Sequence, residues 1–355
     1  MRAAGLIRYV YPIRQVVSFT LVAQNHISAL ARRGVLIAPW DWSNFIDRLM
    51  PGRTLLHPLW YPFIGPGTRG RDLFFRLHGV ARLGGFDVVE TTGLSEEAVS
   101  IANALDFLVV PSNWSARMAA RAGVKVPIYV APHGLSKAFL SEPRPARHPA
   151  VRELAELRRQ GNKLVYFHLW HSGRRKGADL VRKVMERVQQ SMPNALLVIK
   201  RTPSLLDPYL GMLRELRHVE VAEWLGEEDL VSLYDQMDAC LCLSRGGGFE
   251  LVALEAAARG VPTLVPRAGC FLDYCDWLVP VEVAREVPNE MQGNPIHTGA
   301  GFEADWEDAA EKLLQILSEG RRLPEENVEL LRRTYTWERA GEVILYALKR
   351  QGWLD

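Results

Sequence analysis

The chain has 355 residues, enough for two domains of ordinary size, and its 48% hydrophobic and 24% charged residues are typical of a folded globular protein. Its formal net charge of +2 lacks the basic excess of nucleic-acid-binding proteins, so we expect no nucleic-acid partner. No apolar run reaches the roughly 18 residues that span a membrane, and the first residues lack the pattern of a secretory signal. We therefore expect a cytoplasmic protein.

The N-terminal part of the chain alternates short apolar runs with amphipathic helical patterns, which predicts βαβ units and a mainly parallel sheet. The predicted strands are residues 5–12, 34–39, 86–92, 106–112 and 127–134, and the predicted helices are residues 18–34, 95–105 and 113–123. Between residues 41 and 85 both periodicities are lost in a stretch rich in Pro, Gly and aromatic residues. We expect a long loop or an irregular lobe there.

A Pro- and Arg-rich stretch without periodicity, residues 141–150, is the predicted inter-domain linker. A second βαβ series follows it, with predicted strands at 163–170, 194–200, 219–225, 239–244 and 262–266. We therefore expect an α/β fold with two Rossmann-like, doubly wound domains facing a cleft. Their predicted bounds are 1–145 and 146–335, and a terminal helix within 336–355 packs back toward the first domain.

Four cysteines occur in the second half of the chain. Cys240 and Cys242 are two apart on a predicted strand, and Cys270 and Cys275 follow in a later loop. Neither pair has the C-x-x-C spacing of a zinc site, and no histidine cluster accompanies them. We expect reduced, buried thiols and no metal site.

A basic loop follows the first strand of the second series. In "HSGRRKGADL", residues 171–180, Arg174, Arg175 and Lys176 stand between a predicted strand and a predicted helix. In an open α/β sheet this position faces the ligand, and the helix offers its positive N-terminal end. The loop therefore predicts a phosphate or diphosphate site, the alternative being a solvated basic turn.

A glycine-rich loop repeats this geometry in "SRGGGFELVALEAAARGVP", residues 244–262. The glycines at 246–248 turn the chain between a strand and a helix, where backbone N–H groups bind anions. Glu250 lies in the first predicted turn of that helix, where it either faces the ligand or only places a favourable charge at the helix start. Glu255 lies further along in apolar surroundings, where an unpartnered carboxylate is costly. Two anion-binding loops in one domain suit a nucleotide diphosphate.

These residues resemble the group 1 (family 4) retaining glycosyltransferases of GT-B architecture. The resemblance rests on Lys176-Gly177 in the basic loop and on the glycine-rich loop with its helix, namely Ser244, Gly247, Gly248, Phe249, Glu250, Glu255, Ala256, Gly260 and Pro262. The segments Glu90-Thr91-Thr92, Pro111-Ser112 and Pro132-His133-Gly134 also resemble the family. The similarity runs from about Phe86 to Leu272 and includes the terminal helix.

The resemblance implies a metal-independent, retaining transfer of a sugar from a nucleotide-diphosphate donor, UDP- or GDP-linked, to a glycan, lipid-linked or other hydroxyl acceptor. Lys176, with Arg174 or Arg175, would hold the donor diphosphate, and Glu255 would bind the ribose. The remaining donor contacts would come from Ser244, Gly247, Gly248 and Phe249. Because the leaving phosphate assists the incoming hydroxyl in this family, cations rather than a protein nucleophile would be the main catalysts.

The chain departs from the family pattern at three places. The first glutamate of the family's pair falls on Gly247, while Glu250 stands where the family usually has glycine. We expect Glu250 to take over the lost sugar contact and count it with Lys176 and Arg175 as catalytic. The family's arginine before the lysine falls on His171. The third departure is the short, irregular N-terminal stretch between Asp41 and Gly85, where His57 and His78 are both candidates for the family's catalytic-region histidine.

Two alternatives stay open at this point. Gly247 in place of glutamate favours a catalytically weak relative that binds nucleotide or glycan as a scaffold subunit. The aromatic and arginine residues between Trp40 and Arg76 suit either the packing of a small core or peripheral contact with the inner membrane face. The sequence does not indicate an oligomeric state.

Overall fold

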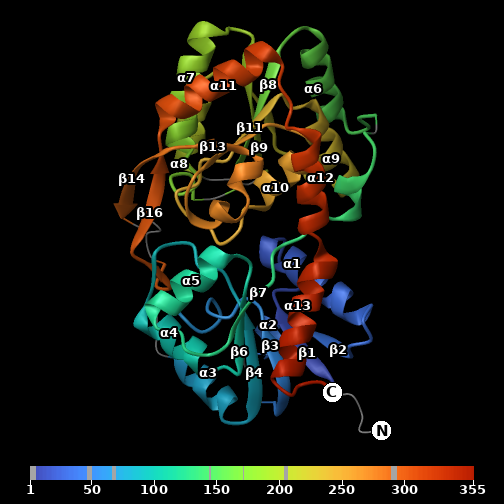
Figure 1. Cartoon of the computed structure of the whole chain (residues 1–355), viewed down its shortest axis with the longest axis vertical. Coiled ribbons are helices and arrows are strands. Elements are labelled where there is room, and N and C mark those ends of the chain that lie inside the picture. The colour runs from blue at the N-terminus through green and yellow to red at the C-terminus, as the bar shows by residue number, and fades with distance from the viewer. Residues whose placement is uncertain are drawn as a thin grey trace. The chain divides into compact units, whose positions relative to one another are not determined.

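The computed structural model describes residues 5–45, 50–65, 69–143, 145–170, 172–203, 207–288 and 294–355. It divides into a first unit, Met1–Gly134, Gln292–Gly299 and Tyr335–Asp355, and a second unit, Leu135–Met291 and Ala300–Thr334. Each unit contains a six-stranded parallel sheet with helices packed on it (Figure 1). This confirms the predicted α/β fold with two Rossmann-like sheets.

The sheet of the first unit has the strand order β2-β1-β3-β4-β6-β7. Its strands are β1 (Ile7–Tyr11), β2 (Ile37–Asp41), β3 (Gly52–Leu56), β4 (Ala81–Phe86), β6 (Phe107–Val110) and β7 (Ile128–Val130). The helices of this unit are α1 (Ser18–Ala31), α2 (Trp42–Phe45), α3 (Arg69–His78), α4 (Glu96–Asn103), α5 (Asn113–Ala122) and α13 (Trp337–Arg350). The terminal helix α13 packs on α1, where a Cβ at Gly341 would lie 2.6 Å from that of Ala29.

Residues 41–85 are not an irregular lobe, because β3 and β4 in this stretch are inner strands of the sheet. The sequence "ARLGGF" of β4 conceals its strand, since two glycines replace the β-branched residues that usually mark one. A Cβ at Gly84 would lie 2.5 Å from the ring of Phe107, and one at Gly85 would lie 2.8 Å from Leu105. Close packing therefore requires glycines at these two positions, against the strand pattern.

The sheet of the second unit has the strand order β10-β9-β8-β11-β12-β13, all parallel. Its strands are β8 (Lys163–Leu169), β9 (Ala195–Arg201), β10 (His218–Val221), β11 (Ala239–Leu241), β12 (Thr263–Pro266) and β13 (Val279–Val281). The helices are α6 (Pro149–Arg159), α7 (Ala178–Ser191), α8 (Pro208–Leu213), α9 (Glu227–Gln236), α10 (Leu251–Ala258), α11 (Trp306–Glu319) and α12 (Glu325–Thr334). An antiparallel pair, β14 (Val283–Pro288) and β16 (Ala300–Ala304), completes this unit.

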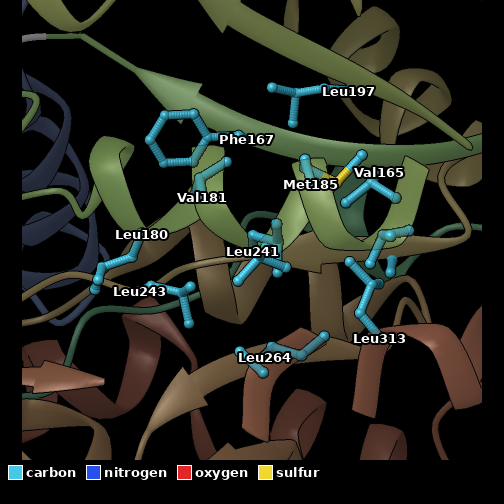
Figure 2. Close-up of a cluster of buried hydrophobic side chains, with 14 of the residues drawn as sticks. Val165, Phe167, Leu180, Val181, Met185, Leu197, Leu241, Leu243, Leu264 and Leu313 are labelled. Atoms are coloured by element: carbon cyan, nitrogen blue, oxygen red, sulfur yellow. The ribbon is translucent and has the colours of Figure 1, made fainter. Parts of the chain in front are cut away.

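The core of the second unit forms where α7 and α11 cover the sheet. Figure 2 shows Leu180, Val181 and Met185 of α7 against the sheet residues Val165 and Leu241. The buried positions of α7 recur every three or four residues, so one stripe of the helix faces the strands. Burial of this apolar stripe fixes the rotation of α7 and thereby the position of its N-terminus.

The boundaries of the units differ from the predicted domain bounds. The first segment of the first unit ends at Gly134 rather than near residue 145, and η1 (Lys137–Leu140) already belongs to the second unit. The first unit also contains β15 (His297–Thr298), which pairs antiparallel with β5 (Gly93–Leu94). A two-residue strand far along the chain has no periodicity, so sequence patterns do not indicate it.

None of the helices in the described part of the chain has the length and apolar character needed to span a membrane.

A cluster of buried histidines lies in the first unit around the hydroxyl of Tyr9. That hydroxyl is 2.9 Å from Nδ1 of His26 and 2.8 Å from Nδ1 of His57. Because the phenol has one proton, it donates to one imidazole and accepts from the other. His57 stacks on Phe86 with a centroid distance of 4.3 Å, and His133 is buried near the same ring. These contacts fit a structural role for His57, while the other candidate, His78, is exposed.

Burial lowers the pKa of His26 to about 3, and burial together with neighbouring histidines lowers the pKa values of His57 and His133. Below the unfolded pKa of about 6.5 the unfolded chain takes up protons that the folded chain excludes. We therefore predict that the free energy of unfolding decreases as the pH falls from 7 toward 4, measured by urea denaturation. His26→Gln should flatten this dependence and His78→Gln should not; an unchanged slope in His26→Gln contradicts the prediction.

Candidate functional site

The basic loop lies between β8 and α7, and its end depends on one glycine. Gly177 is the N-cap residue of α7 and has a positive φ of 77°, a conformation that favours glycine. A Cβ at this position would lie 2.3 Å from the carbonyl oxygen of Leu243. Gly177 thus lets the start of α7 approach the glycine-rich loop more closely than any side chain would permit.

The basic and glycine-rich loops are fastened by hydrogen bonds that involve the backbone. The N–H of Arg245 donates to the carbonyl of Arg175 over 2.7 Å, and the guanidinium of Arg175 donates to the carbonyl of Gly246 over 2.9 Å. Arg174 and Arg175 also line a small hollow together with Arg245, Gly246, Val287, Pro288 and Gly301. The two predicted anion-binding loops therefore lie side by side.

Lys176 and Glu250 form an ion pair across these loops. Nζ of Lys176 lies 2.8 Å from Oε1 and 2.7 Å from Oε2 of Glu250, and the Glu250 side chain is only 5% exposed. A Cβ at Gly247 would lie 2.7 Å from Oε1 of Glu250. The Glu250 carboxylate thus occupies the space into which a side chain at position 247 would project.

Glu250 is the N-cap residue of α10, which begins at Leu251, so it precedes the first helical turn in which it was predicted. Its side chain makes no capping hydrogen bond. The backbone at Glu250 is extended (φ −112°, ψ 92°), as is usual for an N-cap residue, and the carboxylate bonds Lys176.

Glu255 lies within α10 and is bonded to a buried tyrosine. The hydroxyl of Tyr234, on α9, donates to Oε2 of Glu255 over 2.9 Å. Burial raises the pKa of Glu255 to about 7, although the bond from Tyr234 acts in the opposite direction. The residue keeps part of its surface exposed. When a tyrosine fixes one oxygen of a carboxylate, the other oxygen is suited to accept a hydrogen bond from a hydroxyl group of a ligand.

Arg245 anchors the glycine-rich loop, a role that the sequence motifs do not indicate. Its guanidinium bonds Asp179 of α7 and Glu303 of β16, with shortest distances of 2.7 Å to each. Burial alone would raise the pKa values of both carboxyl groups, but the bonds and charge of Arg245 lower them below the usual range. The exposed Arg285 also pairs with Glu303.

The other residues predicted to contact the donor include the chain neighbours of Arg245 and Glu250. Ser244 is buried, and its Oγ has no hydrogen-bond partner within the described residues. Phe249 is buried against Tyr274 with a centroid distance of 5.5 Å. His171, where the family has arginine, lies outside the described residues.

Groups of three or more potential metal ligands are absent from the described ranges of the chain. The four cysteines are free and buried.

Comparison with known proteins finds similarity to a family of glycosyltransferases and to two viral proteins. A family model described as "Family 4 Glycosyltransferase in conflict systems" matches residues 170–344. An uncharacterized protein of Sulfolobus islandicus rod-shaped virus 1 is 28% identical over 320 residues, which cover 87% of each chain. A candidate glycosyltransferase of Sulfolobus islandicus filamentous virus is 29% identical over 241 residues, 66% of this chain and 63% of that protein.

Among solved structures, sucrose-phosphate synthase from Thermosynechococcus elongatus shares the fold with a TM-score of 0.70. The match covers 98% of both chains at 15% identity. The predicted resemblance to family 4 glycosyltransferases of GT-B architecture is therefore confirmed. The family match includes both the basic and the glycine-rich loop.

The buried position of Arg245 leads to a prediction about stability. Arg245→Ala should lower the free energy of unfolding by about 3–5 kcal/mol, because it leaves Asp179 and Glu303 without their main partner. Arg285→Ala is the matched control, and its exposed pair with Glu303 should contribute less than about 1 kcal/mol. Denaturant titration measures both, and equal losses in the two variants would contradict the assignment.

Proposed function

We propose that this chain, a glycosyltransferase of the family 4 type, transfers a sugar from a nucleotide-diphosphate donor to a hydroxyl acceptor with retention of configuration and without a metal ion. The observation that carries the proposal is the ion pair of Lys176 and Glu250, which forms where the basic loop and the glycine-rich loop meet. It joins a phosphate-binding cation to a carboxylate that can accept hydrogen bonds from a sugar.

The donor diphosphate binds at the start of α7, where Lys176 and the exposed part of Arg174 supply positive charge. The N-terminus of this 14-residue helix adds the favourable end of its dipole. As the bond between the sugar and the diphosphate breaks, charge develops on the leaving phosphate, and these fixed cations stabilise it. Arg175 supports the same loop through its bond to Gly246.

In this reaction the bond from the anomeric carbon to the phosphate oxygen breaks, and a bond to the acceptor oxygen forms on the same face of the sugar. The acceptor's proton passes to the leaving phosphate, so the step balances without a protein nucleophile or metal ion. Such chemistry relies on positioning and electrostatic stabilisation. The acceptor is a glycan, a lipid-linked sugar or another hydroxyl compound, and we place the reaction in the cytoplasm.

Glu255 binds the ribose of the donor, with Tyr234 holding the other carboxylate oxygen. The carboxylate of Glu250 accepts a hydrogen bond from a hydroxyl group of the donor sugar, in place of the glutamate that is missing at position 247. This assignment is supported by the contact geometry, because the carboxylate of Glu250 already fills the space beside Gly247.

A second candidate function is a catalytically weak binding subunit. The same ion pair favours it, since the carboxylate of Glu250 pairs with the ammonium group of Lys176. The two functions differ in one observable, the turnover of a bound donor.

We predict that the chain binds UDP or GDP and turns over one of the corresponding sugar nucleotides. Lys176→Ala and Glu255→Ala should each weaken nucleotide binding about 10-fold or more, as expected for lost hydrogen bonds to charged groups.

Because the pKa of Glu255 is about 7 and its carboxylate is the acceptor, the nucleotide affinity should also decrease as the pH falls from 8 to 6. Calorimetry and donor hydrolysis measure these effects. Binding without turnover of any UDP-, GDP- or ADP-sugar would favour the scaffold function, and unchanged affinity in both variants would contradict the site.

Relocation of the glutamate tests the role of Glu250. Glu250→Gln should lower turnover about 10- to 100-fold, the loss expected for a charge-assisted hydrogen bond, with little change in nucleotide affinity. Gly247→Ala should have a similar effect, because its Cβ displaces the Glu250 carboxylate. The double variant Gly247→Glu with Glu250→Gly should recover part of the activity. Gly211→Ala, with open space around the added methyl group, is the control. An equal loss of nucleotide affinity in Glu250→Gln would instead make Glu250 a nucleotide contact.

A further inference from the structure

Charge is divided unevenly along the chain. Residues 1–86 contain 11 arginines and three aspartates, with neither lysine nor glutamate, and residues 1–40 contain no acidic residue. The chain as a whole has a formal charge of only +2, so the residues after 86 have a negative net charge. A basic segment in an otherwise acidic chain indicates contact with an anionic surface, such as a membrane or a nucleic acid.

The same segment exposes aliphatic side chains between β1 and α1. The exposed fractions are 38% for Ile13, 68% for Val16 and 44% for Leu21, near the start of α1. Arg14 is exposed between the first two. We call Ile13, Arg14, Val16 and Leu21 the apolar–basic patch. Its composition suits a lipid surface, which has anionic headgroups above an apolar interior.

Hydrogen bonds fix the backbone of the loop that carries most of this patch. The hydroxyl of Thr20 lies 2.8 Å from the carbonyl oxygen of Pro12 and 2.7 Å from that of Gln15, and it shares its proton between them. The N–H of Arg14 donates to Oδ2 of Asp41 over 3.3 Å. The loop therefore presents its aliphatic side chains in a preformed arrangement, which lowers the entropic cost of binding.

The patch lies at the carboxyl ends of the strands in the first sheet. β1 ends at Tyr11 and β2 ends at Asp41, and the register pairs these two residues. The register also pairs Val10 of β1 with Leu56, the last residue of β3. The loop after β1 thus leaves the sheet where three neighbouring strands end, the edge at which open α/β sheets bind ligands.

Another exposed arginine, Arg71, lies in the first turn of α3. Its neighbour Gly70 packs on the turn that follows β3, because a Cβ there would lie 2.6 Å from the carbonyl oxygen of Phe63. Since β3 is next to β1 in the sheet, Arg71 adds positive charge on the side where β1 and β3 end.

The aromatic residues that first suggested membrane contact are for the most part core residues. Trp60 is 0% and Phe63 is 2% exposed. Tyr61 is 38% exposed and packs on Phe19 of α1 with a centroid distance of 5.7 Å. The loop after β1, rather than the aromatic stretch, is therefore the element suited to enter a lipid surface.

We propose that the first unit docks on a bilayer of anionic lipid through the apolar–basic patch. Ile13 and Val16 enter the boundary between headgroups and acyl chains, and Arg14 pairs with a lipid phosphate. Arg71 and the other arginines of residues 1–86 attract the chain to the surface. This inference goes beyond the proposed function and does not depend on it, because the proposed donor site lies in the second unit.

A second copy of the chain and a nucleic acid are the competing occupants of the patch. In a two-fold dimer the patch would meet itself, so arginine would face arginine without an acidic residue from residues 1–40 to neutralise it. Phosphate groups of a nucleic acid would bind the arginines but leave the aliphatic side chains in water. A bilayer accommodates both kinds of side chain.

The experiment is cosedimentation of the full chain with vesicles. The chain should bind vesicles made of equal parts of phosphatidylglycerol and phosphatidylcholine, and bind pure phosphatidylcholine more weakly. The double variant Ile13→Ser with Val16→Ser should weaken binding about 10-fold or more, because fewer aliphatic carbons leave water. Arg14→Gln should weaken it about 5-fold, as expected for one arginine at an anionic surface. Leu36→Ser is the matched control, because Leu36 is 56% exposed but precedes β2, at the opposite end of the sheet.

Unaltered midpoints of urea denaturation in the variants show that the changes act on the surface and not on folding. Absence of binding to the anionic vesicles overturns the inference, and so does an equal loss in Leu36→Ser and the double variant. Two further results would replace the occupant. Binding of duplex DNA that Arg14→Gln weakens and the double variant does not would identify a nucleic-acid surface, and a dimer that only the double variant disrupts would identify a second copy. Nucleotide affinity should be equal in all these variants, so failure of vesicle binding and failure of the proposed function are separate results.

Discussion

The arrangement of the second unit depends on how closely two backbone segments approach at Gly177. The carbonyl of Leu243 lies where the side chain of any other residue would begin. That contact brings the start of α7 beside the glycine-rich loop, and the bonds of Arg175 and Arg245 then fasten the loops. The cation of one loop and the carboxylate of the other can pair only because no side chain separates the segments.

Charge is distributed unevenly around this contact. Arg245 is neutralised on both sides by Asp179 and Glu303 and so acts as an anchor. Within the described residues Lys176 pairs with the carboxylate of Glu250, and in the proposed function a diphosphate replaces this partner. Because a buried ion pair that loses one partner is costly, Arg245 is suited to hold the loop in place, whereas Lys176 would serve ligand binding in the proposed function.

The sequence predicted two parallel sheets and the basic and glycine-rich loops at strand–helix turns, because apolar periodicity and glycine at such turns report local structure directly. It did not predict β4, whose glycines are required by contact with Phe107 and Leu105, or β15, which is too short to have a period. The bonds of Glu255 to Tyr234 and of Arg245 to Glu303 join residues far apart in sequence, and no local pattern encodes them. The place of Glu250 in the motif suggested that it could replace a glutamate at position 247. That its carboxylate lies against position 247 is seen only in the folded structure.

The start of α10 has a thermodynamic consequence. Glu250 holds the N-cap position without capping the helix, so the first N–H groups of α10 lack the side-chain acceptor that most helices provide. Phosphate or sugar oxygens of a bound donor would complete the helix at that point. Ligand binding and the local folding of α10 would then be a single equilibrium, in which donor concentration sets how often the first turn of the helix opens.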